Sequence, residues 1–156
     1  MSGDINSRPR IVLVNRCFVL NEENKILLTQ RALDDSYLPG YWECPGGKLD
    51  QGQDLNNARE REVLEETGLL IRLTHPFVYA DSYIVSSGKY AGLPYICLFG
   101  ISESLGGKLK LSAEHKDFNW VTYEEALDFE LTPEVRKAMI ILKDYLKAKQ
   151  TDWGYN

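Results

Sequence analysis

The chain has 156 residues, a mass of 17.8 kDa and a formal net charge of −5, with 44% hydrophobic and 26% charged residues. This length predicts one globular domain whose core needs no disulfide or structural metal. The acidic balance argues against a duplex nucleic-acid binder, which needs a basic face for the phosphates, and against a polybasic membrane module. An anionic ligand would then require a local basic cluster or a metal cation.

The first half of the chain predicts strands separated by turns, followed by one helix. Apolar and β-branched runs predict three strands, and turn residues 21–24 join the first two as a hairpin. These strands are expected over residues 11–20, 25–30 and 42–44. Residues 34–41 contain Pro-Gly and predict a loop. Residues 54–67 predict a helix with Asp54 as its N-cap and Gly68 as its C-terminal stop.

The second half predicts further strands and two more helices. The strands are expected over residues 70–73, 77–85, 95–102 and 118–121. Turns are expected at 86–88 and 105–108. Thr122 and Glu125 form a capping box that opens a short helix, and a longer helix is expected over 133–149. Strands interrupted by single helices predict an α/β fold in which helices cover a sheet.

The cysteines indicate a reducing compartment. They are odd in number and scattered: Cys17, Cys44 and Cys97. This fits neither a secreted disulfide framework nor the spacing of a metal site. The first ten residues hold no apolar segment of the signal-peptide kind, and no apolar run is long enough to span a membrane. We therefore expect a cytoplasmic protein with one domain over 11–149, a flexible N-terminal segment at 1–10 and a C-terminal tail at 150–156.

Three carboxylates gather on one side of the helix expected over 54–67. In helical projection, Glu62, Glu65 and Glu66 occupy a fan of about 100°, and Arg59 and Arg61 flank it. Like charges this close repel unless a counter-ion lies among them. A hard divalent cation such as Mg²⁺ or Mn²⁺ suits oxygen ligands, while a solvated acidic helix is the alternative.

A glycine pair directly precedes this helix. Gly46 and Gly47 follow the strand expected at 42–44, and paired glycines let a backbone approach a ligand closely. The strand, the glycine loop and the carboxylate helix can together surround one metal and a phosphate chain. A plain tight turn is the alternative.

The spacing in this region resembles the box of the Nudix hydrolases, G-x5-E-x7-R-E-U-x-E-E-x-G-U, in which U is aliphatic. Six of the seven fixed residues and both aliphatic positions are present over Gly47–Leu69. Gln53 stands in place of the first glutamate. Looser similarity to MutT-like members extends to the Gly-Tyr-Trp-Glu lead-in at 40–43 and to residues 120–125.

The resemblance implies an α/β/α sandwich around a mixed sheet and a hydrolase of phosphoric anhydride bonds. It implies cleavage of the diphosphate linkage of a nucleoside diphosphate derivative, with Mg²⁺ or Mn²⁺ as cofactor. A MutT-like (d)NTP pyrophosphohydrolase is favoured over a nucleotide-sugar, dinucleoside polyphosphate or ADP-ribose pyrophosphatase. The expected partner is a small nucleotide, not duplex nucleic acid or a membrane. Residues 86–94 are expected to serve as a lid or in a homodimer.

By position in the box, the resemblance makes Glu62, Glu65 and Glu66 the metal-facing carboxylates. The Gly46 carbonyl is a further ligand, and Arg61 orients Glu62. Family members often add an acid from a later loop.

Glu114 is the best match for that acid, as a ligand or as the general base, and Glu62 is the other candidate for the base. Arg31, at the end of a predicted strand, suits a phosphate because of its forked guanidinium, although a surface arginine is the alternative.

The lead-in to the box is expected to contact substrate through Glu43, Cys44 and Gly47. Several aromatic residues can stack a base or pack the core: Tyr37, Tyr41, Trp42, Tyr83 and Tyr90. Specificity for 8-oxoguanine is not implied, since no asparagine stands near residues 131–132.

Gln53 departs from the family pattern at a position that commonly supports the box arginine. Glutamine keeps hydrogen bonding but removes a charge, so we predict reduced metal affinity or rate. Two other classes stay open. One is a weakly active Nudix module that binds a nucleotide, and the other is a cysteine hydrolase that uses Cys44 with His115.

Overall fold

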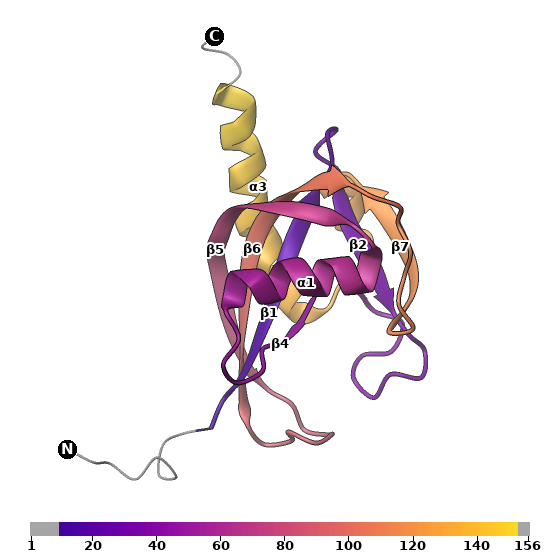
Figure 1. Ribbon diagram of the computed structural model, residues 1–156, viewed down its shortest axis with the longest axis vertical. Coiled ribbons are helices and arrows are strands. Elements are labelled where there is room, and N and C mark those ends of the chain that lie inside the picture. The colour runs from indigo at the N-terminus through magenta and orange to yellow at the C-terminus, as the bar shows by residue number, and fades with distance from the viewer. Residues whose placement is uncertain (1–9, 153–156) are drawn as a thin grey trace, which may run out of the picture.

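The computed structural model describes residues 10–152 of the protein (Figure 1). The elements follow one another as β1 (Val12–Leu20), β2 (Ile26–Arg31), β3 (Trp42–Glu43), β4 (Gly46–Lys48), α1 (Leu55–Thr67), β5 (Leu70–Ile84), β6 (Pro94–Gly106), β7 (His115–Val121), α2 (Tyr123–Ala126) and α3 (Pro133–Asp152). No helix within this part of the chain is long and apolar enough to cross a membrane.

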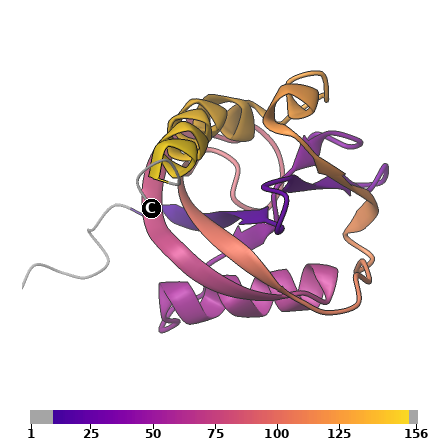
Figure 2. The same ribbon diagram turned by 90° about the horizontal axis from the view of Figure 1, so that it is seen from above.

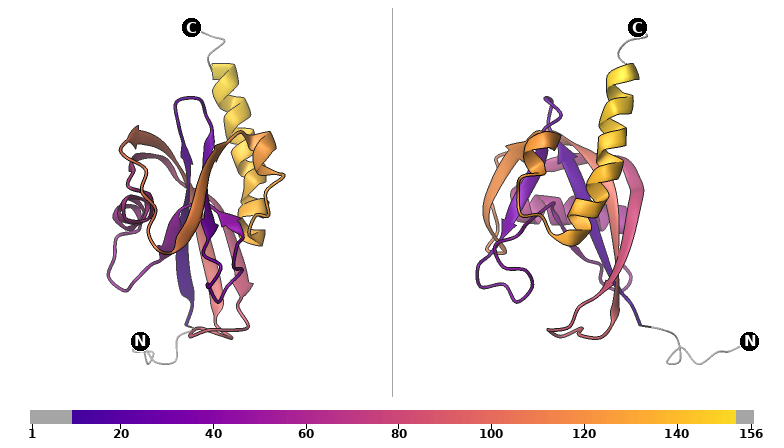
Figure 3. Two further views of the ribbon diagram at one scale, coloured as in Figure 1. Left: turned by 90° about the vertical axis from the view of Figure 1, so that its right-hand side faces the viewer. Right: turned by 180° about the vertical axis from the view of Figure 1, so that it is seen from behind.

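The strands form a mixed, seven-stranded sheet with the order β3-β2-β1-β6-β5. Off this path, β4 pairs with β1 and β7 pairs with β2. The β1–β6 pairing is parallel and the others are antiparallel. Helix α1 lies across one face of the sheet, and α3 with α2 lies on the other (Figures 2 and 3). The predicted α/β/α sandwich around a mixed sheet is confirmed.

The alternation of β1 divides the core between the two faces. Phe18 packs towards α3 in the larger cluster, which includes Met139 and Leu142. Cys17 packs in the smaller cluster, which includes Val63 of α1. The period of two in a strand therefore places successive side chains of β1 in different layers.

Several predicted boundaries are wrong, and the sheet explains each difference. Residues 46–48 form strand β4 rather than a loop, because Gly46 lies so close to β1 that a Cβ would be 2.0 Å from the Asn15 carbonyl oxygen. The two strands predicted between 70 and 85 are one strand, β5, whose register shifts on both sides of His75.

The later strands are also longer than predicted. Strand β6 continues to Gly106, through the start of the turn expected there, and β7 begins at His115. Helix α3 runs three residues beyond its expected end, so part of the expected tail is helical. The rest of that tail and residues 1–9 lie outside the described part.

Helix α1 has the predicted ends. Asp54 caps its N-terminus by accepting a hydrogen bond from the Asn57 N–H, and Gly68 ends it in the left-handed conformation. One expectation on its surface is wrong, because Arg59 does not flank the acids in solvent. Its buried side chain lies against Gly100 and donates to the Pro76 carbonyl. Burial lowers the pKa of Arg59.

Candidate active site

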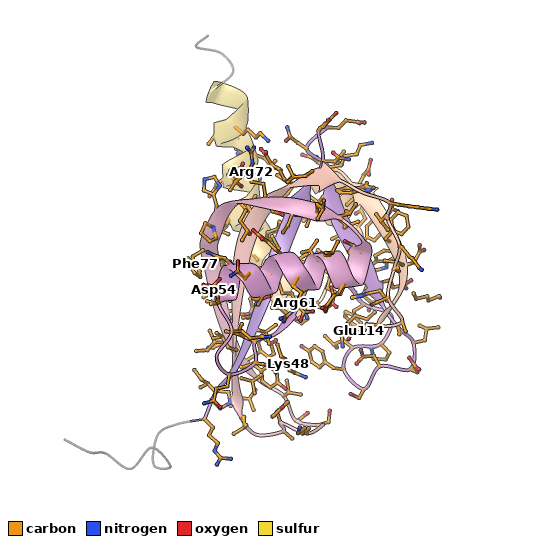
Figure 4. The ribbon with its side chains drawn as sticks, viewed as in Figure 1. Lys48, Asp54, Arg61, Arg72, Phe77 and Glu114 are labelled. Atoms are coloured by element: carbon orange, nitrogen blue, oxygen red, sulfur yellow. The ribbon has the colours of Figure 1, made fainter. Side chains whose placement is uncertain are left out.

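A cavity of about 440 Å³ opens between α1, β4 and the start of β7. The loop after β2 and the loop between β5 and β6 complete its wall. Glu62, Glu66 and Glu114 all line it. In Figure 4, Glu114, Arg61 and Lys48 lie on the same side of α1. Residues that are far apart in the sequence therefore meet at one end of the sheet.

Two glycines of β4 bring the backbone against the carboxylates of α1. The Gly46 N–H donates to Glu66 Oε2 at 3.2 Å. A Cβ on Gly47 would lie 3.0 Å from Glu62 Oε2. Any larger side chain at Gly47 would displace that carboxylate. The glycine pair therefore lets the backbone approach the carboxylates closely, from a strand and not from a loop, and its approach to a ligand stays a prediction.

The carboxyl groups of Glu62 and Glu66 lie in surroundings that disfavour their charge. Burial raises the pKa of Glu66 well above its usual value, and the charge of Arg16 and the hydrogen bond from Gly46 only partly offset this effect. Burial also raises the pKa of Glu62, with Glu65 and Glu114 adding repulsion. A cation between these groups would relieve both effects. The oxygen donors fit a hard divalent metal ion.

The C-terminus of α1 is tied to the segment that carries Glu114. The Lys110 N–H donates to the Thr67 carbonyl at 2.9 Å, and the Ser112 N–H donates to the Glu66 carbonyl at 3.1 Å. Ligand atoms of Glu66, Glu114 and His115 lie within 4.8 Å of one another. The structure thus brings Glu114 to the helix acids.

Glu65 lies outside the cavity wall. Its side chain is 61% exposed, with Oε1 at 3.6 Å from Arg61 Nε. Arg61 also reaches Glu62, whose Oε1 lies 3.9 Å from Arg61 Nη2. The predicted orienting role of Arg61 stays a prediction. A metal role for Glu65 stays a prediction and would need its side chain to turn inward.

Glu43 lies at the centre of an ion-pair network that the sequence did not predict. Its buried carboxylate accepts hydrogen bonds from Arg31 Nη1 at 3.0 and 3.1 Å, and Arg16 Nη2 lies 3.1 Å away. His115 Nε2 lies 3.0 Å from Glu43 Oε1. Burial alone would raise the pKa of Glu43, but Arg16, the His115 hydrogen bond and Arg31 lower it to about 2. Glu43 is therefore an ionised residue that holds the neighbouring side chains in place, and its oxygens have little capacity left to bind substrate.

Arg31 is likewise committed to protein groups. Besides Glu43, it donates from Nε to the Tyr37 carbonyl at 2.7 Å and pairs with Asp35 at 2.8 Å. Arg31 lines the cavity, but through these contacts it holds the loop after β2 in place. To contact a phosphate as predicted, Arg31 would need guanidinium N–H groups that are not already bound to Glu43, Tyr37 or Asp35.

Residues 12–140 match the NUDIX domain family. The chain belongs to this family. The predicted Nudix hydrolase, acting on phosphoric anhydride bonds, is confirmed. Nudix hydrolases generally use divalent metal ions and small nucleotide substrates, and the acidic cluster fits that chemistry.

Several other proteins are similar to this chain over most of its length. The chain is 27% identical over 128 residues to nucleoside triphosphatase NudI of Escherichia coli O139:H28, covering 79% of this chain and 91% of that protein. Its fold is similar to that of a MutT protein from Methanosarcina mazei Go1, with a TM-score of 0.74 and 23% identity over 90% of this chain and 97% of that one. A Caenorhabditis elegans Ap4A hydrolase gives a TM-score of 0.68 at 22% identity, with 88% of this chain and 98% of that chain covered.

Two residues of the Nudix box region have structural contacts that bear on their predicted roles. Gln53 Oε1 accepts the Asp50 N–H at 2.9 Å, which closes the turn before α1. Cys44 is fully buried in the core towards α3, where burial raises the pKa of its thiol. The predicted substrate contact of the Cys44 side chain does not fit this position. A cysteine hydrolase is also disfavoured, because it needs an accessible thiolate.

The sequence did not indicate Arg16 in this Nudix site, and it indicated His115 only as a partner of Cys44. Their signal was weak: Arg16 is a charged residue within an apolar strand, and His115 directly follows Glu114. Of the aromatic residues considered for base stacking, Tyr37, Tyr83 and Tyr90 line the cavity. Trp42 instead packs against Phe129.

Proposed function

We propose that this Nudix hydrolase is a MutT-like (d)NTP pyrophosphohydrolase that cleaves the diphosphate linkage of a nucleoside diphosphate derivative. The observation that carries the proposal is the convergence of Glu62, Glu66 and Glu114 on one cavity beside the glycine backbone of β4. The 27% identity to a nucleoside triphosphatase over most of both chains supports a triphosphate substrate.

Glu62, Glu66, Glu114 and the Gly46 carbonyl would hold Mg²⁺ or Mn²⁺. When bound, such an ion neutralises the diphosphate and lowers the pKa of a coordinated water. The chain itself supplies the acceptor of the water proton, for which Glu62 and Glu114 are the candidates. Arg61, 3.9 Å from Glu62, would steady that carboxylate.

The tyrosines of the cavity wall suit a nucleoside. The rings of Tyr83 and Tyr95 stack at 5.3 Å, and both residues line the cavity with Tyr37. Lys48 and Lys89 each lie 5.3 Å from the Tyr90 ring. A base can pack on these rings, and the ammonium groups can approach the phosphates.

The main test is hydrolysis of a nucleotide panel by wild-type protein and by Glu66→Gln. With Mg²⁺, wild type should convert nucleoside triphosphates to monophosphates and pyrophosphate. Glu66→Gln should lower kcat by at least about 100-fold, since it removes a buried carboxylate from the site. The exposed Glu60→Gln on the same helix is the matched control and should keep wild-type kcat. Near-normal turnover of Glu66→Gln, with both variants folded by circular dichroism, would contradict the proposal.

The same panel separates the alternative substrates. Nucleotide sugars, dinucleoside polyphosphates and ADP-ribose belong in it, and two similar folds motivate the last two. One is the C. elegans Ap4A hydrolase; the other is the NUDIX domain of Shewanella oneidensis NrtR, whose complex holds ADP ribose. Preferred cleavage of one of these would replace the triphosphate assignment.

A weakly active nucleotide-binding module is the alternative of another class, and Gln53 is its motivation. We infer that the missing charge at this position weakens metal binding or turnover. Gln53→Glu should then tighten Mg²⁺ binding or raise kcat severalfold, measured by calorimetry and pyrophosphate release. The exposed Gln51→Glu is a matched control for added charge on the same turn. Equal behaviour of Gln53→Glu and wild type would remove this idea.

We also infer a reducing compartment, the cytoplasm. The support is that Cys17, Cys44 and Cys97 are buried free thiols. The loop at 86–94 stays a proposed lid or homodimer element; Ser87, Lys89 and Tyr90 from it line the cavity, which favours the lid.

A further inference from the structure

The two ring nitrogens of His115 have different surroundings. His115 is the first residue of β7 and is only 7% exposed. Nε2 lies 3.0 Å from Glu43 Oε1. Nδ1 is buried and has no hydrogen-bond partner among the described residues. A buried polar atom without a partner is costly, so Nδ1 calls for an explanation.

The Glu43 network determines which nitrogen carries the proton. Both Glu43 oxygens already accept from Arg31, and Arg16 lies against the same carboxylate, so Glu43 is an ionised acceptor. Nε2 must therefore donate to it. In the neutral imidazole, Nδ1 then presents a lone pair.

His115 lies in a group of possible metal ligands. A ring nitrogen of His115, an oxygen of Glu66 and an oxygen of Glu114 lie within 4.8 Å of one another. Since Nε2 is occupied by Glu43, Nδ1 is the nitrogen available to the group. An ionised Glu66 and the lone pair cannot satisfy each other, because neither donates. A cation among them can satisfy all three.

We propose that His115 Nδ1 is a metal ligand beside Glu66 and Glu114, and that it biases the site towards Mn²⁺ or Co²⁺ over Mg²⁺. The inference rests on the proposed metal-dependent function. Imidazole nitrogen suits borderline transition ions, whereas Mg²⁺ prefers oxygen ligands. Glu43 acts as the positioning residue, because a carboxylate on the far nitrogen orients a ligating histidine and raises its basicity.

Pulsed electron paramagnetic resonance of the Mn²⁺-loaded full chain tests the ligand directly. Wild type should show a ¹⁴N coupling from a directly bound imidazole, and ¹⁵N-histidine labelling should convert it to a ¹⁵N coupling. His115→Gln should abolish it, while the side-chain amide of Gln can still donate to Glu43. His75→Gln is the matched control and should keep the coupling, since the other histidine of the chain packs against Tyr145.

Metal titration gives the second measurement. By calorimetry, His115→Gln should weaken Co²⁺ binding by at least about tenfold and leave Mg²⁺ binding within about threefold. An unchanged Co²⁺ to Mg²⁺ affinity ratio would overturn the proposal and indicate that His115 is a protonated partner of the acids. Absence of a ¹⁴N coupling in Mn²⁺-loaded wild type would also overturn it.

The wild-type spectrum tests the proposal even if a variant fails to fold. Both measurements are made without a nucleotide, so they can fail while nucleotide hydrolysis succeeds. The proposed function fails separately, if wild type with Mg²⁺ or Mn²⁺ hydrolyses no member of the panel.

Discussion

At the residue scale, the site contains buried carboxylates with opposite electrostatics. Glu43 is surrounded by cationic and donating groups, and its pKa is lowered to about 2. Glu66 is comparably buried, but burial dominates and raises its pKa. The first group is an anion at neutral pH that holds Arg16 and Arg31. The second is only partly compensated, by Arg16 and the Gly46 N–H, which is the property expected of a metal-binding carboxylate.

Glu43→Gln should destabilise the protein by about 3 kcal/mol at pH 7, because it leaves two buried arginines without their shared anion. Glu43 has a folded-state pKa of about 2 against a usual 4.5, so its contribution is present above pH 4.5 and is lost as the pH falls towards 2. The difference between wild type and variant should shrink over that window in urea unfolding. Asp35→Asn is the control, since Asp35 is 29% exposed and pairs with the same Arg31. It should cost less than about 1 kcal/mol. A Glu43→Gln effect that does not vary with pH would contradict this account.

At the element scale, the end of α1 positions the loop before β7. The last carbonyls of α1 accept the N–H groups of Lys110 and Ser112, and the Glu114 carbonyl accepts the Ala32 N–H at 3.1 Å. Gly68 lies at this junction with φ of +76°, and a Cβ there would be 2.4 Å from the Lys108 carbonyl oxygen. The stop signal of the helix is therefore also a contact point for the segment that carries Glu114.

Gly68→Ala should cost roughly 3 kcal/mol, because left-handed strain and a backbone clash add together. Gly52→Ala is the matched control: its φ is +82°, but a Cβ would meet nothing within 4 Å. It should cost only about 1 kcal/mol. Thermal and urea unfolding measure both variants. Equal losses would mean that the Lys108 contact is unimportant. Gly68→Ala should also weaken Mn²⁺ binding, since the clash moves Glu114 and His115.

At the scale of the whole molecule, the two cores bury every cysteine. Cys17, Cys44 and Cys97 are all 0% exposed, and they lie on both faces of the sheet. Thiol reactivity therefore reports on opening of the whole fold, because no surface thiol exists to react first.

Native protein should react negligibly with an aromatic disulfide reagent over minutes, and three thiols should react after denaturation. Burial raises the pKa of Cys17 to about 11 and that of Cys97 to about 12, so few thiolates form at neutral pH. Ser87→Cys, at an exposed position on the cavity loop, is the positive control and should react at once. Rapid reaction of a native thiol would contradict the packing described.

The sequence by itself determined the parts of this protein that depend on local chemistry. The ends of α1 were predictable because Asp54 and Gly68 satisfy backbone groups next to them in the chain. The capping box of Thr122 and Glu125 was predictable for the same reason, and the structure contains both of its hydrogen bonds. The Nudix resemblance was readable because its residues lie within one short segment, Gly47–Leu69.

Only the tertiary structure decided what depends on strand pairing and burial. Gly46 and Gly47 form a strand because they pair with β1. That pairing cannot be inferred from the residues next to them in the sequence. Folding buries the side chains of Arg59 and Cys44. It also brings Arg16, Glu43 and His115 together from three separate strands. Ion pairs form where folding brings opposite charges together. How far apart two residues are in the sequence does not tell how far apart their charges are in space. The acids of the box were therefore predictable, whereas the buried network of Arg16, Glu43 and His115 beside them was not.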